Sequence, residues 1–177
     1  MTSLADLKKK TATKPATPAK SVAKKSRFEG VDRDGDQTPM PHVGLYRLRL
    51  KKAVEEASKK TQNMFWKGYW EIVECDDRAL ESHAVGDTVM CMFPTSGNGA
   101  RSGLQKLKSC VWALAQADGR GLEEGVVNAL CDAACDDGEA FELIGREVLA
   151  SVRKGKSIPD TDDYYREYDW TEMPVGD

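Results

Sequence analysis

The chain has 177 residues, with 26 Lys and Arg against 29 Asp and Glu and a net charge of −3. The charge is uneven, because residues 1–27 hold eight Lys and Arg against one Asp, which leaves 18 basic and 28 acidic residues in 28–177. An acidic body disfavours tight, sequence-independent binding to duplex DNA, which depends on neutralising phosphates. A local basic groove remains compatible with it, because screening limits charge effects to about 8–10 Å at physiological salt.

The composition also bounds the class of protein. A body of this length predicts one domain that buries roughly 70% of its unfolded surface without disulfides. The five cysteines are an odd number and mostly lie in apolar segments, which indicates a reduced, cytosolic protein with buried free thiols. The N-terminus lacks the apolar segment of a signal peptide, and no apolar stretch is long enough for a membrane span.

Residues 1–27 are the first predicted unit, a disordered basic tail. Segment 8–27 consists mainly of Lys, Ala, Thr and Pro without aromatics, so it cannot bury enough surface to offset its ordering entropy. Two roles for the tail stay open, an arm that captures polyanions and a solubilising leader. The folded domain is predicted over residues 28–177, beginning with a turn-rich stretch at 29–44.

The main evidence for a function comes from two strand-like runs, 44–54 and 63–73. In the first run apolar side chains alternate with the cations Arg47, Arg49 and Lys51. The second run surrounds Lys67 with four aromatic residues, Phe65, Trp66, Tyr69 and Trp70. Side chains alternate between the faces of a strand, so a hairpin of these runs buries one face and presents a cationic, aromatic one. The better core set of the second run is Met64, Trp66, Trp70 and Ile72, which leaves Phe65, Lys67 and Tyr69 exposed.

The middle of the chain predicts a third strand and two helices. The strand covers 87–93 and follows a tight turn at 83–87. The first helix begins at an N-cap, Ser102, and ends at Asp118-Gly119. Its apolar stripe consists of Leu104, Leu107, Val111 and Leu114. The second helix covers 122–135, with a stripe of Leu122, Val126, Leu130 and Ala134.

The chain then returns to strand patterns at 140–152 and 163–174. In 140–152 the even-numbered side chains are the more apolar and are expected to face the core. In 163–174 one face carries Tyr164, Arg166, Tyr168 and Trp170. Three strands, a helix pair and two strands predict a mainly β fold with inserted helices, in the α+β class. This order is that of a five-stranded OB-fold-like barrel with the helix pair between strands three and four.

The order of several short motifs carries a family resemblance. They are PMPHVGLYRLRL before and within the first strand, FWKGYWEIVE in the second, HAVGDTVMCMF at the third, LQKLKSCVWAL in the helix and GREVLASV late in the chain. Over about residues 28–172 this outline resembles phage-encoded OB-fold single-stranded DNA-binding proteins. The chain departs from that family in its longer helical insertion and in lacking a long acidic tail after the last strand.

Eight side chains are the candidate nucleic-acid-binding residues. Arg47, Arg49 and Lys51 suit a row of phosphates, and the alternative is an ordinary solvated strand face. Phe65, Lys67 and Tyr69 suit base stacking beside a cation. Arg101 and Lys106, with Lys108 nearby, lie on or near the Gly-rich loop 95–101, and solvated helix lysines are the alternative for them.

The motifs of catalysis and metal binding are incomplete. The segment GNGARSG lacks the P-loop Lys, and DRDGDQ lacks the ligand spacing of a calcium loop. Cys131 and Cys135 lie on one helical face, but no CxxC or HxxxH pair accompanies them, which favours structural thiols over zinc ligands. His42 and His83 are the only histidines, and neither lies in a nucleophile motif. We therefore expect no enzyme activity, metal or cofactor.

Together these features predict a protein that binds single-stranded DNA without strong sequence preference during phage replication or recombination. It would work in the host cytoplasm, beside replication or recombination proteins, and it could form homo-oligomers. The alternative is an OB-like interaction module that docks on a replication, nuclease or host defence protein.

Overall fold

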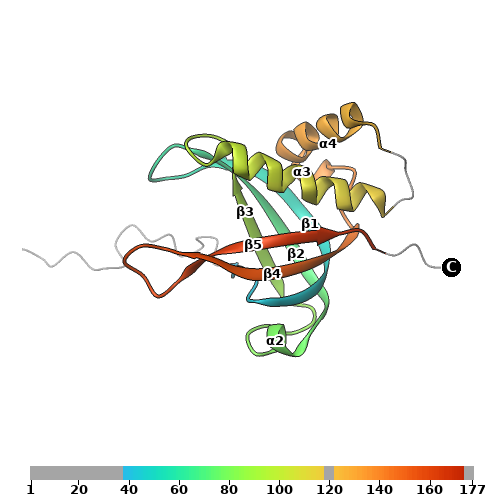
Figure 1. Ribbon diagram of the computed structural model, residues 1–177. Helices are drawn as coiled ribbons and strands as arrows, with labels where there is room; N and C mark the ends of the chain where they lie inside the picture. Colours follow the sequence, from blue (N-terminus) through green and yellow to red (C-terminus); the bar gives the residue numbers. More distant parts are fainter. Residues whose placement is uncertain (1–37, 118–121, 174–177) are drawn as a thin grey trace, which may run out of the picture. The chain divides into compact units, whose positions relative to one another are not determined.

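The computed structural model describes residues 38–117 and 122–173, and these form a mainly β domain (Figure 1). Five strands build one antiparallel sheet in the order β3-β2-β1-β4-β5. The strands are β1 Gly44–Ala57, β2 Met64–Cys75, β3 Thr88–Pro94, β4 Glu147–Ser157 and β5 Tyr164–Thr171. The helices are α2 Asp77–Leu80, α3 Ala100–Gln116, α4 Glu124–Asp136 and the 3-10 turn η1 Gly138–Ala140. The predicted mainly β class with inserted helices is confirmed.

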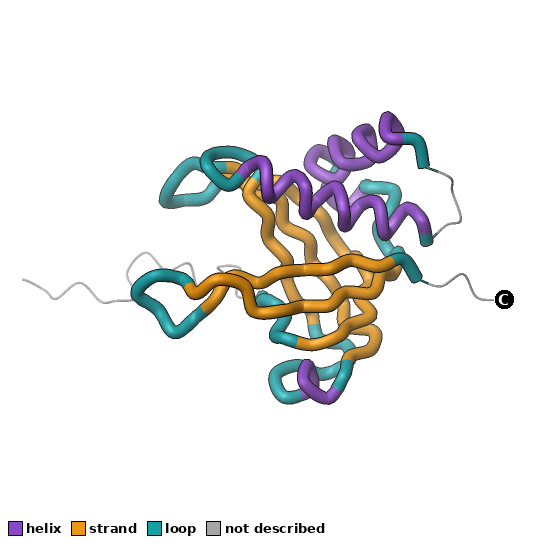
Figure 2. Tube along the Cα trace, viewed as in Figure 1, coloured by secondary structure: helices purple, strands orange, loops and turns teal. Residues whose placement is uncertain are grey.

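Strand β1 is the centre of the sheet, because it pairs with β2 along its length and with β4 through residues 44–49. Irregularities in the β1–β2 register at Arg47/Leu48 and Leu50/Lys52 mark bulges, which bend a strand and increase its twist. Figure 2 shows β4 and β5 crossing over the other three strands. No backbone ladder joins β3 to β5 within the described ranges, so the sheet is open between its edge strands.

Side chains nevertheless connect the two edge strands. The Phe93 ring of β3 lies edge-on to Tyr168 of β5, with ring centroids 5.5 Å apart. Residues 38–43 lie beside the same opening, since Met90 N–H donates to the Pro39 carbonyl at 2.8 Å. From the other edge, Arg166 Nε donates to the Pro41 carbonyl at 3.1 Å.

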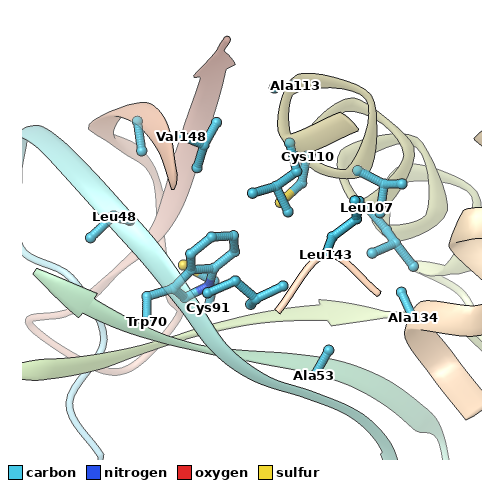
Figure 3. Packing of buried hydrophobic residues seen from close by; sticks show 14 of the residues in the cluster. Leu48, Ala53, Trp70, Cys91, Leu107, Cys110, Ala113, Ala134, Leu143 and Val148 are labelled. Atoms are coloured by element: carbon cyan, nitrogen blue, oxygen red, sulfur yellow. The ribbon is translucent and has the colours of Figure 1, made fainter. Parts of the chain in front are cut away.

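The core lies between the inner face of the sheet and the helices α3 and α4. Figure 3 shows Trp70 and Cys91 on the sheet side, with Leu107 and Cys110 from α3 across from them. Trp66 is fully buried and its Nε1 donates to the Ala134 carbonyl of α4 at 3.0 Å. The predicted core face of β2 is therefore correct, because Trp66, Trp70 and Ile72 are all inaccessible to solvent.

The two helices differ from their predicted faces by one residue each. In α3, Leu107, Val111 and Leu114 are buried as predicted, but Leu104 is 47% exposed. In α4 the buried residue of the first turns is Val127, while Val126 is 46% exposed. The α4 stripe was written at strict four-residue spacing, which drifts around a helix of 3.6 residues per turn and moved Val126 off the core.

Other boundaries need correction as well. Gly99, without a side-chain cap, precedes α3, so Ser102 is inside the helix rather than its N-cap. The strand predicted over 140–152 begins only at Glu147, because Gly145 adopts a φ of +85° and ends a turn. Leu143 is buried from that turn and not from a strand face. Val148, Ala150 and Val152 face the core as predicted. The short helix α2 and η1 were not predicted.

Some predictions lie outside the described residues. These are the disordered tail 1–27, the start of the domain at residue 28 and the helix end at 118–119. Across residues 38–117 and 122–173, none of the helices has the length and apolar character needed to cross a bilayer.

Candidate nucleic-acid interface

The outer face of β1 carries the predicted cations, and each has a carboxylate partner. Arg47 Nε lies 2.6 Å from Glu147, and Arg49 Nη2 lies 2.6 Å from the other oxygen of the same carboxylate. Arg49 also reaches Glu71 at 3.3 Å, and Lys51 reaches Glu71 at 3.4 Å. The acids come from the neighbouring strands β2 and β4, so the sheet itself neutralises this face.

Glu147 is the centre of that network. Burial alone raises its pKa, but hydrogen bonds from Arg49 and Arg47 outweigh burial and hold the pKa below the usual 4.5. The carboxylate thus stays charged and shared between two guanidinium groups, an arrangement in which hydrogen bonds are charge-assisted. A phosphate that bound Arg47 or Arg49 would have to compete with Glu147 for the same donors.

The outer face of β2 divides into two parts. Lys67 forms an ion pair with Glu56 at 2.8 Å, and Tyr69 has the Lys52 ammonium 5.9 Å from its ring centre. Phe65 differs from both, because its half-buried side chain lines a cavity between the two edge strands. The structure therefore brings Phe65 to a concave site and leaves Lys67 and Tyr69 outside it.

This edge cavity has a volume of about 400 Å³ and is walled by three segments far apart in sequence. Strands β2 and β3 supply Phe65 and Met92, and the start of α3 supplies Gly103 and Lys106. The β4–β5 turn and the start of β5 supply the third wall, which consists of Ile158, Asp163, Tyr164, Tyr165, Arg166 and Tyr168. The volume lies in the range of ligand pockets, roughly 300–1,000 Å³.

The polar groups of the edge cavity are few. Lys106 and its neighbour Arg101 form no ion pair with any residue in the described ranges. Arg166 is held by Asp163 at 3.3 Å and lies 5.2 Å from the Tyr164 ring centre. The Tyr164 hydroxyl is buried without a hydrogen-bond partner in the described structure. Such a group normally finds a partner, because leaving it unpaired costs about 1–3 kcal/mol.

The start of α3 adds backbone donors to the cavity. Gly99 and Ser102 both line it, and no side chain caps the helix. The first turn of a helix has unpaired N–H groups and a partial positive charge, which together favour an anion. The cavity thus combines aromatic walls with a cation and helix donors at its rim.

The sequence pointed to only part of this site. Of the eight predicted residues, the edge cavity brings together Phe65 and Lys106, and Arg101 lies next to its lining at the start of α3. Arg47, Arg49, Lys51, Lys67 and Tyr69 do not line it. The residues missed include Met92, Tyr164, Tyr165 and Arg166. The shared face of Tyr164 and Arg166 was visible in the alternation of 163–174, but nothing local indicated that β5 would meet β3.

The described residues contain no group of three or more potential metal ligands. All five cysteines are free, and Cys91 and Cys110 are buried as the sequence predicted. Burial raises the pKa of Cys91 to about 12 and that of Cys131 to about 11. Cys135 also has a pKa of about 12, chiefly through burial, with Glu55 contributing. Such thiols are poor nucleophiles and poor metal ligands at neutral pH.

No protein-family model matches the chain, and no curated protein is significantly similar to it in sequence.

Proposed function

We propose that the protein binds single-stranded DNA without strong sequence preference, and that the edge cavity holds an unstacked base. In this proposal it protects displaced strands during phage replication or recombination, in the cytoplasm and beside replication or recombination proteins. The observation that supports it best is the cavity between β3 and β5. It combines Phe65 and Tyr165 with the unpaired Lys106, at a size suited to one nucleotide.

The energetics favour stacking over charge. Stacking one base on an aromatic side chain is worth about 1–3 kcal/mol and tolerates any base. The phosphate contribution is limited, because only Arg101 and Lys106 of the six predicted cations are unpaired within the described residues. A base inside a duplex presents no free face to a cavity, so single strands are preferred over duplexes.

We also propose that the sheet is of the OB type, because β1 lies between β2 and β4 and the helices α3 and α4 separate β3 from β4. The Phe93–Tyr168 contact supports a barrel whose last seam is closed by side chains instead of a ladder. OB-folds bind oligonucleotides on such a surface. A homo-oligomer is compatible with the proposal, and cooperative binding is common among such proteins.

The alternative is an interaction module that docks on a replication, nuclease or host defence protein. The observation in its favour is the neutralised outer face of β1, which leaves few cations for DNA.

The test compares two aromatic residues of one strand face. Fluorescence anisotropy of a labelled oligothymidylate of about 30 nucleotides, titrated with the full chain, should show binding that Phe65→Ala weakens roughly 5- to 150-fold, the equivalent of one lost stacking contact. Tyr69→Ala is the matched control, because Tyr69 shares the outer face of β2 but lies outside the cavity. The basic tail is present in both variants, so its contribution cancels. Equal affinities for the two variants and the wild type would refute the cavity as the binding site.

A salt series tests the charge assignment separately. The two phosphate contacts of the edge cavity should contribute about −1.4 to the slope of log affinity against log salt for a single strand, and any contribution of the basic tail is the same in every variant. Lys106→Gln should reduce that slope by about 0.7, and Arg49→Gln should leave it unchanged because Arg49 is bound by Glu147 and Glu71. Thermal unfolding of each variant checks that the domain remains folded.

A further inference from the structure

A second cavity, the α2-end cavity, lies at the opposite ends of β2 and β5 from the edge cavity. It has a volume of about 450 Å³ and is lined by Cys75 at the end of β2 and Thr171 at the end of β5. Two leucines line it with exposed side chains, Leu45 at 58% and Leu149 at 36%. Figure 1 shows α2 at this end of the strands, away from α3 and α4. The leucines point outward from β1 and β4, so core packing does not explain them.

The surroundings of the α2-end cavity are acidic. Segment 74–87, which joins β2 to β3 through α2, carries one cation, Arg78. It carries five acids, namely Glu74, Asp76, Asp77, Glu81 and Asp87. Glu74 and Asp76 line the cavity directly, and the one lining cation, Arg47, is bound by Glu147 at 2.6 Å.

Three of the lining residues contribute backbone to the cavity. Tyr46 lies directly opposite both Cys75 and Ala150 in the sheet, and the side chains of all three pack toward the core. The pKa of the Cys75 thiol is raised, first by burial and then by the charges of Asp76, Asp87 and Glu74.

We propose that the α2-end cavity docks a partner protein through an aliphatic side chain that is flanked by Lys or Arg. The exposed leucines provide the apolar contact, and Glu74 with Asp76 and Asp77 at the start of α2 faces the flanking cations. This surface is separate from the proposed DNA site, because no residue lines both cavities.

Charge also decides between possible occupants. Nucleic acid is repelled by five acids against one cation. A second copy in a two-fold contact would place the same patch against itself, acids against acids, because such interfaces are isologous. A basic segment with an aliphatic side chain is complementary to both the exposed leucines of the cavity and the acids around it.

The test uses a defined probe, the hexapeptide acetyl-KRLLRK-amide, titrated into the isotope-labelled full chain while amide NMR shifts are recorded. We expect saturable shifts that centre on the backbone amides of Leu45, Cys75 and Leu149. Two control peptides, one with Leu replaced by Ser and one with Glu in place of the basic residues, should bind roughly tenfold more weakly or worse.

Matched variants locate the site. Leu45→Ser and Glu74→Gln should each weaken the probe several-fold, whereas Leu104→Ser and Glu139→Gln, exposed leucine and glutamate controls elsewhere, should not. Phe65→Ala, which weakens the proposed DNA site, should leave peptide binding intact, so failure of the DNA proposal is distinguishable from failure of this one. Shifts elsewhere, equal binding of the acidic peptide, or self-association that Leu45→Ser abolishes in sedimentation would overturn the proposal.

Discussion

The outer face of β1 and the edge cavity both carry cations, yet they differ in where the acids lie. On β1 every predicted cation has a carboxylate within 3.4 Å, supplied by Glu71 or Glu147. At the edge cavity Lys106 has no ion-pair partner among the described residues, and the one lining acid, Asp163, is bound to Arg166. The charge available to a phosphate is thus set by neighbouring strands rather than by the strand that carries the cations.

The ion pairs on β1 and the polar groups of the edge cavity also differ in how much they stabilise the fold. Ion pairs at a surface are each worth about 0–1 kcal/mol, so the β1 network stabilises the sheet modestly while it reduces the charge open to ligands. The edge cavity is less stabilised by its polar groups, as the unpaired Tyr164 hydroxyl indicates. The cations on the outer face of β1 are paired within the sheet. The edge cavity has the Tyr164 hydroxyl and the Lys106 ammonium, which a ligand can contact.

The largest expected effect is on the helix that positions Lys106. A Cβ at Gly103 would lie 1.8 Å from the Pro94 carbonyl oxygen, so α3 packs on β3 only because this position lacks a side chain. Gly103→Ala should lower the free energy of unfolding by about 3 kcal/mol, since backbone atoms cannot yield as a flexible side chain can. Urea denaturation measures the change. DNA binding at the edge cavity should weaken in parallel, because α3 forms one of its walls.

Gly125→Ala is the control for that substitution. Gly125 is also helical, in α4, but a Cβ there meets nothing within 4 Å. The variant should gain up to about 1 kcal/mol from helix propensity. A loss of stability in Gly125→Ala comparable to that in Gly103→Ala would show that the close approach to Pro94 is not the cause.

The second prediction concerns the ion pairs on the outer face of β1. Glu147→Gln removes the carboxylate that Arg47 and Arg49 share and should lower the free energy of unfolding by about 1 kcal/mol. Arg47 is then released while Arg49 keeps Glu71 at 3.3 Å, so affinity for oligothymidylate should rise at low salt and the salt slope should steepen by about 0.7. A fall in affinity would contradict this, because it would mean that Glu147 holds the arginines in place for phosphate.

The same network predicts an acid dependence. The folded-state pKa of Glu147 lies below its unfolded value of 4.5, so its contribution to stability is present above that value and is lost as the pH falls through the folded pKa. The free energy of unfolding of Glu147→Gln should therefore vary less than that of the wild type below pH 4.5.

Much of the fold was predictable from local pattern. Alternation in β1 and β2 identified Trp66 and Trp70 as core and Phe65 as outward, because strand side chains alternate whatever the tertiary context. The order of strands and helices followed from turns and helical periodicity. Errors arose where the pattern was interrupted, as at Gly145, whose positive φ ends a turn inside an apparently continuous strand.

The site was less predictable because it depends on contacts between distant segments. Arg49 and Glu147 are 98 residues apart, and no local pattern shows that they meet. Phe65 and Tyr164 line one cavity only because β5 lies near β3. A row of cations is visible in a sequence, but the acids opposite it become known only when strand register is known.

The smallest predicted effect concerns the segment that lies beside the edge cavity. His83 Nε2 accepts a hydrogen bond from the His42 backbone N–H at 3.1 Å, and Met40, two residues earlier, lines the cavity. Burial lowers the pKa of His83, with His42 and Arg166 lowering it further against the opposing effects of Asp87 and the Met40 backbone. A protonated ring cannot accept the His42 bond, so the geometry and the pKa both favour the neutral form.

The sign of the pH dependence follows from that shift. The folded protein binds fewer protons at His83 than the unfolded chain, so this contribution to stability is present above about pH 6.5 and is lost as the pH falls below it. His83→Gln retains an acceptor but does not titrate, so its free energy of unfolding should change less than that of the wild type between pH 7 and pH 5. His42→Gln is the control, because His42 contributes only its backbone to this bond. If the His42 variant flattened the pH dependence as much as the His83 variant, the bond between residues 42 and 83 would not be the pH-sensitive contact at the edge cavity.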